Sequence, residues 1–175
     1  MKVLVDIHDT MQHLLKHVVR EHNMRYRTSV DIENVTDWLA PNLPQAKELF
    51  TDPDINRYVT PIHGAGLALT LIKPYADITI VSSSLCPEDT DTAFTRDFPY
   101  LRNLERVYVA DKLPYIEQAD IVVDDAPHVL IAARNTYKTA CGLKTPYNSH
   151  LQSEDIRLFD SWYRMFLFIM GELRW

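Results

Sequence analysis

The chain has 175 residues, a length typical of one domain that contains a small insertion. Its hydrophobic content of 46% and its charged content of 24% are typical of a soluble globular protein. The formal net charge of −6 argues against binding of an extended nucleic acid, because such surfaces need a basic face. A local basic pocket for one phosphate is compatible with this charge.

The two cysteines, Cys86 and Cys141, have no ligand-like spacing, and this usage is typical of a reducing compartment. The N-terminus lacks the pattern of a signal peptide, and the most apolar stretch, Trp162–Met170, is too short to span a bilayer. We therefore expect a cytoplasmic protein with no membrane partner.

The first part of the chain combines one strand with a helical insertion. The apolar segment Lys2–Val5 predicts a strand, and apolar residues at helical spacing predict a helix over Met11–His22. The stretch from Tyr26 to Tyr58 is polar and interrupted by prolines, with short helices expected over Asp31–Leu39 and Pro44–Thr51. This composition indicates a small helical insertion.

Strands and helices alternate in the middle of the chain. Strands are predicted over Asp77–Val81, Val107–Val109 and Ile121–Val123, and helices over Pro61–Lys73, Asp89–Phe98 and Pro114–Gln118. This alternation predicts an α/β fold with a parallel sheet flanked by helices. Beyond Asp125 we expect a short helix or strand within His128–Arg134, a loop at 145–148, and a final helix over Glu154–Leu173.

The acidic pair Asp124-Asp125 directly follows the strand Ile121–Val123, and Asp6 and His8 directly follow the first strand. Ligands bind at the carboxyl ends of parallel strands, and crowded carboxylates repel each other unless a cation such as Mg²⁺ binds them. An Asp pair at this point can also simply begin a turn or cap a helix. Two such strand ends in one chain favour the metal site.

The other predicted strand ends carry groups that suit a phosphate. Ser82 and Ser83 follow the second strand, and Lys112 follows the third. Singly, serines after a strand usually cap a helix, and a loop lysine is usually solvated. Together with the carboxylates they form a phosphate site, in which hydroxyls bind the phosphoryl oxygens, Lys112 offsets their charge and one Asp can attack phosphorus.

This order of groups resembles the haloacid dehalogenase (HAD) superfamily, and more closely its 5'(3')-deoxyribonucleotidase-like branch. The resemblance rests on Val3–Thr10, on Ile78–Ser83, on Lys112 with Ala119–Asp125, and on the later segments 145–150 and 161–162. It implies a Rossmann-like HAD core over residues 1–10 and 59–175, with a small helical cap over residues 11–58.

The resemblance also implies roles for individual residues. Asp6 is expected to be the nucleophile that forms an aspartyl-phosphate, and Lys112 to steady the nucleophile and the phosphate. The residues expected to bind Mg²⁺ are Asp6, the backbone carbonyl of His8, and Asp124 or Asp125. Three aromatic residues of the cap and its edges are candidates for stacking on a base, although a role in the cap's own core is the alternative for each: Tyr26, Trp38 and Tyr58.

The chain departs from the family pattern at His8, where the family has an Asp that acts as general acid and base. An imidazole can perform acid–base chemistry near neutral pH, but it is larger, and if protonated it is disfavoured beside Mg²⁺. The leading expectation is a Mg²⁺-dependent phosphatase for a small phosphomonoester such as a deoxyribonucleoside monophosphate, with a homodimer as an option for its assembly. The alternative is a catalytically impaired HAD-like protein that binds a nucleotide or a protein partner, and a phosphotransferase is a third reading.

Overall fold

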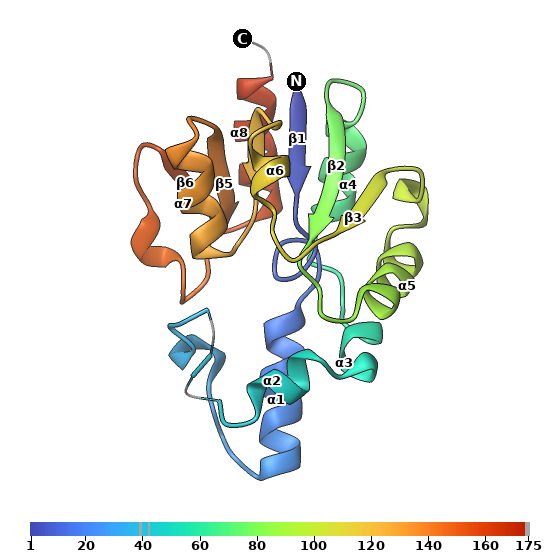
Figure 1. The fold of residues 1–175 in the computed structure, drawn as a ribbon, viewed down its shortest axis with the longest axis vertical. Coiled ribbons are helices and arrows are strands. Elements are labelled where there is room, and N and C mark those ends of the chain that lie inside the picture. Colours follow the sequence, from blue (N-terminus) through green and yellow to red (C-terminus); the bar gives the residue numbers. More distant parts are fainter. Residues whose placement is uncertain (39, 42, 174–175) are drawn as a thin grey trace.

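The sheet at the centre of the molecule contains six strands in the described part of the chain, and all of them run parallel (Figure 1). The computed structural model describes residues 1–38, 40–41 and 43–173. Because the strands are parallel, their carboxyl ends meet at one edge of the sheet. The predicted fold class is confirmed. In spatial order the strands are β3 (Glu105–Tyr108), β2 (Asp77–Ser82), β1 (Lys2–Val5), β4 (Ile121–Val123), β5 (Thr139–Leu143) and β6 (Ile156–Phe159).

Helices cover both faces of the sheet. In β1, Val3 and Val5 lie in the core on one face, whereas Leu4 lies in the core on the other face. A parallel sheet buried on both faces needs such continuous apolar strands, which explains why the central strands were recognisable from sequence. One face packs against α4 (Ala65–Ile72), α5 (Pro87–Asp97) and α8 (Trp162–Glu172), and the other against α6 (Leu113–Ile116) and α7 (Pro127–Asn135).

The end of the chain differs from the prediction. The predicted helix over Glu154–Leu173 is wrong in its first part, because β6 occupies Ile156–Phe159 and α8 begins only at Trp162. Ser161 caps α8 through a hydrogen bond from the Arg164 amide to its side chain. Strand β5 is absent from the prediction, and the open choice at His128–Arg134 resolves as the helix α7.

Several other predicted helices have shifted bounds. Helix α4 begins at Ala65 rather than at Pro61, because Gly64 adopts a left-handed conformation with φ of 85° in front of it. In the stretch predicted as a helix over Asp31–Leu39, a 3₁₀ turn covers Ile32–Asn34 only, and Leu39 lies outside the described residues. The remaining helices of this region are α1 (Leu14–Tyr26), α2 (Ala46–Phe50) and α3 (Pro53–Arg57).

The helical segment, residues 11–58, lies beyond the carboxyl ends of the strands, at the opposite end of the molecule from both termini (Figure 1). Apart from Met11, which packs in a core of the sheet, its buried apolar residues form a distinct core with Val18, Leu49 and Ile55 among them. Val59, Ala93 and Tyr147 from the rest of the chain join this core. Within the described residues, no helix is long and apolar enough to cross a membrane.

Candidate active site

Three carboxylates converge where β1 and β4 end. Asp6 follows β1, and Asp124 and Asp125 follow β4. The Asp6 amide donates a hydrogen bond to the Val123 carbonyl at 2.9 Å, so the pairing of the two strands continues to the site. One carboxylate oxygen from each of the three residues lies within 4.8 Å of the others, and all three residues are buried. The strand ends thus bring together the acidic residues that the sequence singled out.

Lys112 lies between two of these carboxylates. Its Nζ is 2.6 Å from Oδ1 of Asp6 and 2.7 Å from Oδ2 of Asp124, and the residue is only 7% exposed. Burial opposes the charged form of the lysine, but the two carboxylates outweigh burial and raise the pKa of Lys112. The ammonium group therefore stays charged and compensates Asp6 and Asp124.

Asp125 has neutral partners instead. Thr10 donates a hydrogen bond to its Oδ1 at 3.1 Å, and the Tyr147 hydroxyl donates to its Oδ2 at 2.6 Å. Burial, together with the nearby charges of Asp124 and Asp6, raises the pKa of Asp125 well above its ordinary value. Among the described residues no cationic side chain forms an ion pair with Asp125, so its charge is the least compensated of the three.

The residues that support Asp125 escaped the sequence analysis. The Trp162 indole donates a hydrogen bond to the Thr10 carbonyl at 2.7 Å, and thereby links α8 to the loop after β1. Asn148 donates through Nδ2 to the backbone carbonyl of Asp125 at 3.0 Å. The segments that contain Tyr147, Asn148 and Trp162 were recognisable only through the family resemblance, which carried no role for them.

Ser82 and Ser83, at the end of β2, line a cavity together with Asp6, Lys112, Asp124 and Asp125. The Ser82 hydroxyl is buried and finds no hydrogen-bond partner among the described residues. A buried hydroxyl without a partner is rare and calls for an explanation such as a ligand. Ser84 instead bonds Thr90 at 2.7 Å.

His8 and Asp9 follow the nucleophile candidate on the same loop. Burial lowers the pKa of His8 to about 3, the Lys112 charge adds to this effect, and the imidazole is therefore neutral near pH 7. Its Nε2 lies 3.3 Å from the Thr90 hydroxyl. Both carboxylate oxygens of Asp9 accept the Leu15 amide, at 3.1 and 3.0 Å, so Asp9 stabilises the beginning of α1.

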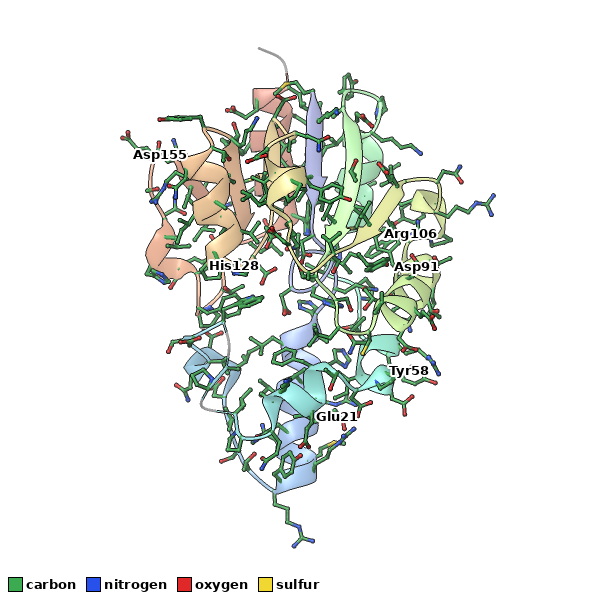
Figure 2. All side chains as sticks on the ribbon, viewed as in Figure 1. Glu21, Tyr58, Asp91, Arg106, His128 and Asp155 are labelled. Atoms are coloured by element: carbon green, nitrogen blue, oxygen red, sulfur yellow. The ribbon has the colours of Figure 1, made fainter. Side chains whose placement is uncertain are left out.

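These groups form the floor of a cavity of about 430 Å³ between the sheet edge and the helical segment. Trp38 lines this cavity and packs edge-on against His128 of α7, with ring centroids 4.7 Å apart. The other two aromatic candidates, Tyr26 and Tyr58, are not among the residues that line it. Tyr58 is 64% exposed, and Figure 2 shows it on the opposite side of the helical segment from His128.

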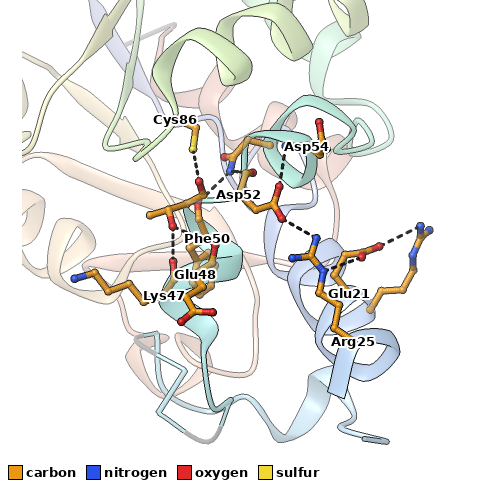
Figure 3. A network of polar contacts seen from close by, with 11 residues as sticks. Glu21, Arg25, Lys47, Glu48, Phe50, Asp52, Asp54 and Cys86 are labelled. Atoms are coloured by element: carbon orange, nitrogen blue, oxygen red, sulfur yellow. Dashed lines mark hydrogen bonds and ion pairs between the residues drawn. The ribbon is translucent and has the colours of Figure 1, made fainter. Parts of the chain in front are cut away.

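The helical segment is attached to the rest of the molecule mainly beside α5. The Arg57 guanidinium forms an ion pair with Asp89 at 2.6 Å, and the Cys86 thiol donates to the Thr51 carbonyl at 3.2 Å. Figure 3 shows the Cys86 contact and, next to it, the ion pair of Arg25 and Asp52. This ion pair lies within the helical segment and has an N–O distance of 2.6 Å. These contacts fix one wall of the cavity relative to the sheet.

The donor set fits a hard divalent cation such as Mg²⁺. Mg²⁺ prefers oxygen ligands and commonly uses one or two carboxylates together with a substrate phosphate. Asp6, Asp124 and Asp125 supply such oxygens from a buried cluster that Lys112 compensates only in part.

The comparisons with known proteins concern the family and the fold. A family model described as "5' nucleotidase, deoxy (Pyrimidine), cytosolic type C protein" matches residues 1–172. No curated protein matches the chain. A HAD family hydrolase from Deinococcus radiodurans R1, solved with bound phosphate and sodium, superposes with a TM-score of 0.68 at 14% identity, over 98% of this chain and 96% of that one.

Two further solved structures are similar. A D,D-heptose 1,7-bisphosphate phosphatase from Burkholderia thailandensis gives a TM-score of 0.62 at 10% identity, over 97% of this chain and 98% of that one. A hydrolase from Pseudomonas syringae gives 0.62 at 14% identity, over 98% and 99%. At such low identities these likenesses establish the HAD-like fold alone.

Proposed function

The chain belongs to the family of HAD-like 5'-nucleotidases, which are phosphomonoester hydrolases, and from that premise we propose that it hydrolyses a deoxyribonucleoside monophosphate with the help of Mg²⁺. The observation that carries the proposal is the cluster of Asp6, Asp124 and Asp125 around Lys112, beside the unpartnered hydroxyl of Ser82. These residues line one cavity, where they would supply the nucleophile, the metal ligands and the donors to the phosphate.

In this mechanism the phosphoryl group is held by Ser82, Ser83 and Lys112. Lys112 holds Oδ1 of Asp6, which leaves Oδ2 to attack phosphorus. The bond from phosphorus to the nucleoside oxygen breaks, and the leaving oxygen takes a proton from solvent. Asp6 becomes an aspartyl-phosphate.

Water then attacks phosphorus, and the Asp6 carboxylate leaves as inorganic phosphate forms. His8 lines the cavity two residues after Asp6, and we assign its imidazole as the base for this water; it is a weak base, because burial lowers its pKa to about 3. Tyr147 and Thr10 hold Asp125 in place throughout.

Asp6, the backbone carbonyl of His8, and Asp124 or Asp125 would hold Mg²⁺. When bound, the ion supplies positive charge that offsets the carboxylates and the phosphoryl oxygens. The ion would offset the charge of Asp125 most, because the hydrogen-bond partners of Asp125, Thr10 and Tyr147, are neutral.

We propose further that residues 11–58 act as a cap over a core made of residues 1–10 and 59–175. The separate apolar core of this segment, and its contributions to the cavity from Leu14, Leu15, Trp38, Lys47 and Phe50, support this division. A small phosphorylated metabolite would be enclosed between cap and core. Because Cys86 and Cys141 are both free, we propose that the protein is cytoplasmic. We also propose a homodimer, which sedimentation would test.

The test is phosphate release from a panel of nucleotides with Mg²⁺, by the wild-type protein and by Asp6→Asn. We expect turnover by the wild type and loss of at least about 10⁴-fold in the variant, because the nucleophile is removed. Phosphate release at equal rates by both proteins would refute the assignment of Asp6. Release from no substrate would refute the hydrolase.

A second candidate function follows from His8, which replaces the acidic residue of the family pattern. A protein with an impaired acid–base group would bind a nucleotide, or a partner protein, without turning it over. It predicts Mg²⁺-dependent nucleotide binding by calorimetry in the wild type without phosphate release, and a gain of turnover in His8→Asp. Turnover by the wild type that falls in His8→Asp would exclude this reading.

A further inference from the structure

The walls of the cavity contain residues that have no role in the proposed reaction. These walls are mainly apolar, and they contain one charged side chain from the helical segment, Lys47 of α2. Within the described chain, the lysines that line the cavity are Lys47 and Lys112. The apolar residues of these walls are Leu14, Leu15, Trp38, Phe50, Leu85 and Val129.

Lys47 differs from Lys112 in having no carboxylate partner. Lys112 is bound to Asp6 and Asp124, whereas the exposed Lys47 forms no ion pair with any residue that the structure describes. In Figure 3 the Lys47 side chain extends away from the ion pair of Arg25 and Asp52. Its ammonium is therefore available to a ligand.

Lys47 also lies beside an aromatic ring. Lys47 and Phe50 are three positions apart on α2, and residues at this spacing share one face of a helix. Both line the cavity. A planar group that packs against Phe50 would thus have an edge near the Lys47 ammonium.

The charges of the residues that line the cavity indicate which substrate group could bind the Lys47 ammonium. Four carboxylates and two lysines line the described cavity. The proposed Mg²⁺ would balance this set, and a substrate phosphate would then leave an excess of negative charge at the floor. A second anionic group on the substrate would meet this excess of negative charge. A neutral carbonyl oxygen accepts a hydrogen bond from the ammonium without this penalty.

We propose that Lys47 is a specificity-determining residue that donates a hydrogen bond to a carbonyl oxygen on the far edge of the substrate's base. In this proposal the phosphate lies at the floor against Ser82 and Lys112, and the far edge of the base lies against Lys47, which lines the same cavity and is exposed. An amino group in the same place would present a second donor to the ammonium and would be rejected. This inference rests on the proposed function.

The test compares deoxyuridine and deoxycytidine 5'-monophosphates, which have the same size but carry a carbonyl and an amino group, respectively, on the far edge. In Lys47→Met the ratio of their kcat/KM values should fall by about tenfold, the usual value of a hydrogen bond to a charged group. Lys47→Arg keeps a donor and should retain most of the ratio. Lys73→Met, an exposed lysine at the end of α4, should leave it unchanged.

Binding of the same two nucleotides to Asp6→Asn and to Asp6→Asn with Lys47→Met, measured by calorimetry, separates this inference from the proposed function. If the wild type releases no phosphate, the hydrolase fails, but a Kd ratio that depends on Lys47 still supports the inference. An unchanged ratio in Lys47→Met, or equal losses on both nucleotides, would overturn it. Absence of binding by both nucleotides would overturn the inference, whereas phosphate release alone decides the hydrolase.

Discussion

The hydroxyl of Tyr147 lies 2.6 Å from Oδ2 of Asp125, and both residues are buried although 22 positions separate them in sequence. Burial raises the pKa of Tyr147 well above its ordinary value, and the nearby Asp125 carboxylate adds to this effect, so the phenol keeps its proton and remains a donor. With Thr10 on the other oxygen, Tyr147 fixes the orientation of a carboxylate that has no ion-pair partner among the described residues.

Tyr147→Phe removes this donor and preserves the ring. We expect Mg²⁺ affinity to fall by about 10–100-fold, the usual effect of removing a residue that orients a metal ligand. Calorimetric titration of the metal in the absence of substrate measures this directly. Tyr163→Phe is the control, because Tyr163 is 70% exposed on α8. If Tyr147→Phe lowers the melting temperature but leaves the Mg²⁺ affinity unchanged, Tyr147 serves the fold and not the site.

Gly142 of β5 provides the close approach that Asp124 needs. A Cβ atom at Gly142 would stand 1.9 Å from the Asp124 carbonyl oxygen, a distance that forces the backbone of one strand to move. Gly142→Ala should therefore lower the free energy of unfolding by about 1–3 kcal/mol and reduce turnover by displacing Asp124. Urea denaturation and phosphate release measure the two effects.

Gly171→Ala is a matched control for this substitution. A Cβ at Gly171 would meet nothing within 4 Å, and the residue lies in α8. Alanine should stabilise the helix there by about 0.5–1 kcal/mol and leave turnover unchanged. Equal effects of the two substitutions would contradict the role of Gly142.

The extent to which this fold is predictable from sequence depends on burial. Strands β1 and β4 lie in the middle of the sheet, and their continuous apolar runs give their bounds correctly. Strand β5 contains Thr139, Ala140 and Gly142 instead of a β-branched run, so periodicity does not reveal it. Strand β6 is short and lies just before the aromatic helix α8 in the sequence, so the boundary between them could not be recognised.

The site residues that come directly after a strand could be predicted from the sequence. Asp6, Asp124 and Asp125 are of this kind, and the structure places them together. Thr10 and Tyr147 are not, because their contacts with Asp125 span 115 and 22 positions and depend on tertiary folding. An isolated glycine such as Gly142 within a strand is a usable sign of close backbone approach, but only after the strand itself is known.

Mg²⁺ should stabilise the folded protein. A ligand that binds only the native state at a concentration of 100 times its Kd adds about 2.7 kcal/mol to the free energy of unfolding. For a chain of this size we expect the melting temperature to rise by roughly 5–10 °C when EDTA is replaced by millimolar Mg²⁺ near neutral pH. Asp125→Asn should lose most of this response. A wild-type melting temperature that is the same in EDTA and in Mg²⁺ would contradict the metal site.

Lys112 should be essential for stability as well as for turnover. Lys112→Met leaves the carboxylates of Asp6 and Asp124 buried without their ion-pair partner, and breaking a buried pair lowers the free energy of unfolding by about 3–5 kcal/mol. Adding Asp6→Asn removes one of these buried charges, so the double variant should recover part of the loss. The two substitutions are therefore expected to be strongly non-additive.

Urea denaturation in EDTA of the wild type, both single variants and the double variant measures this coupling without interference from the metal. Lys16→Met is the control, because Lys16 is exposed on α1 and its loss should change stability by less than about 0.5 kcal/mol. If the effects of Lys112→Met and Asp6→Asn simply add, the ammonium does not compensate Asp6 in the folded protein. A double variant more stable than Lys112→Met alone would confirm that the buried carboxylates, rather than lost packing of the lysine stem, cause the instability.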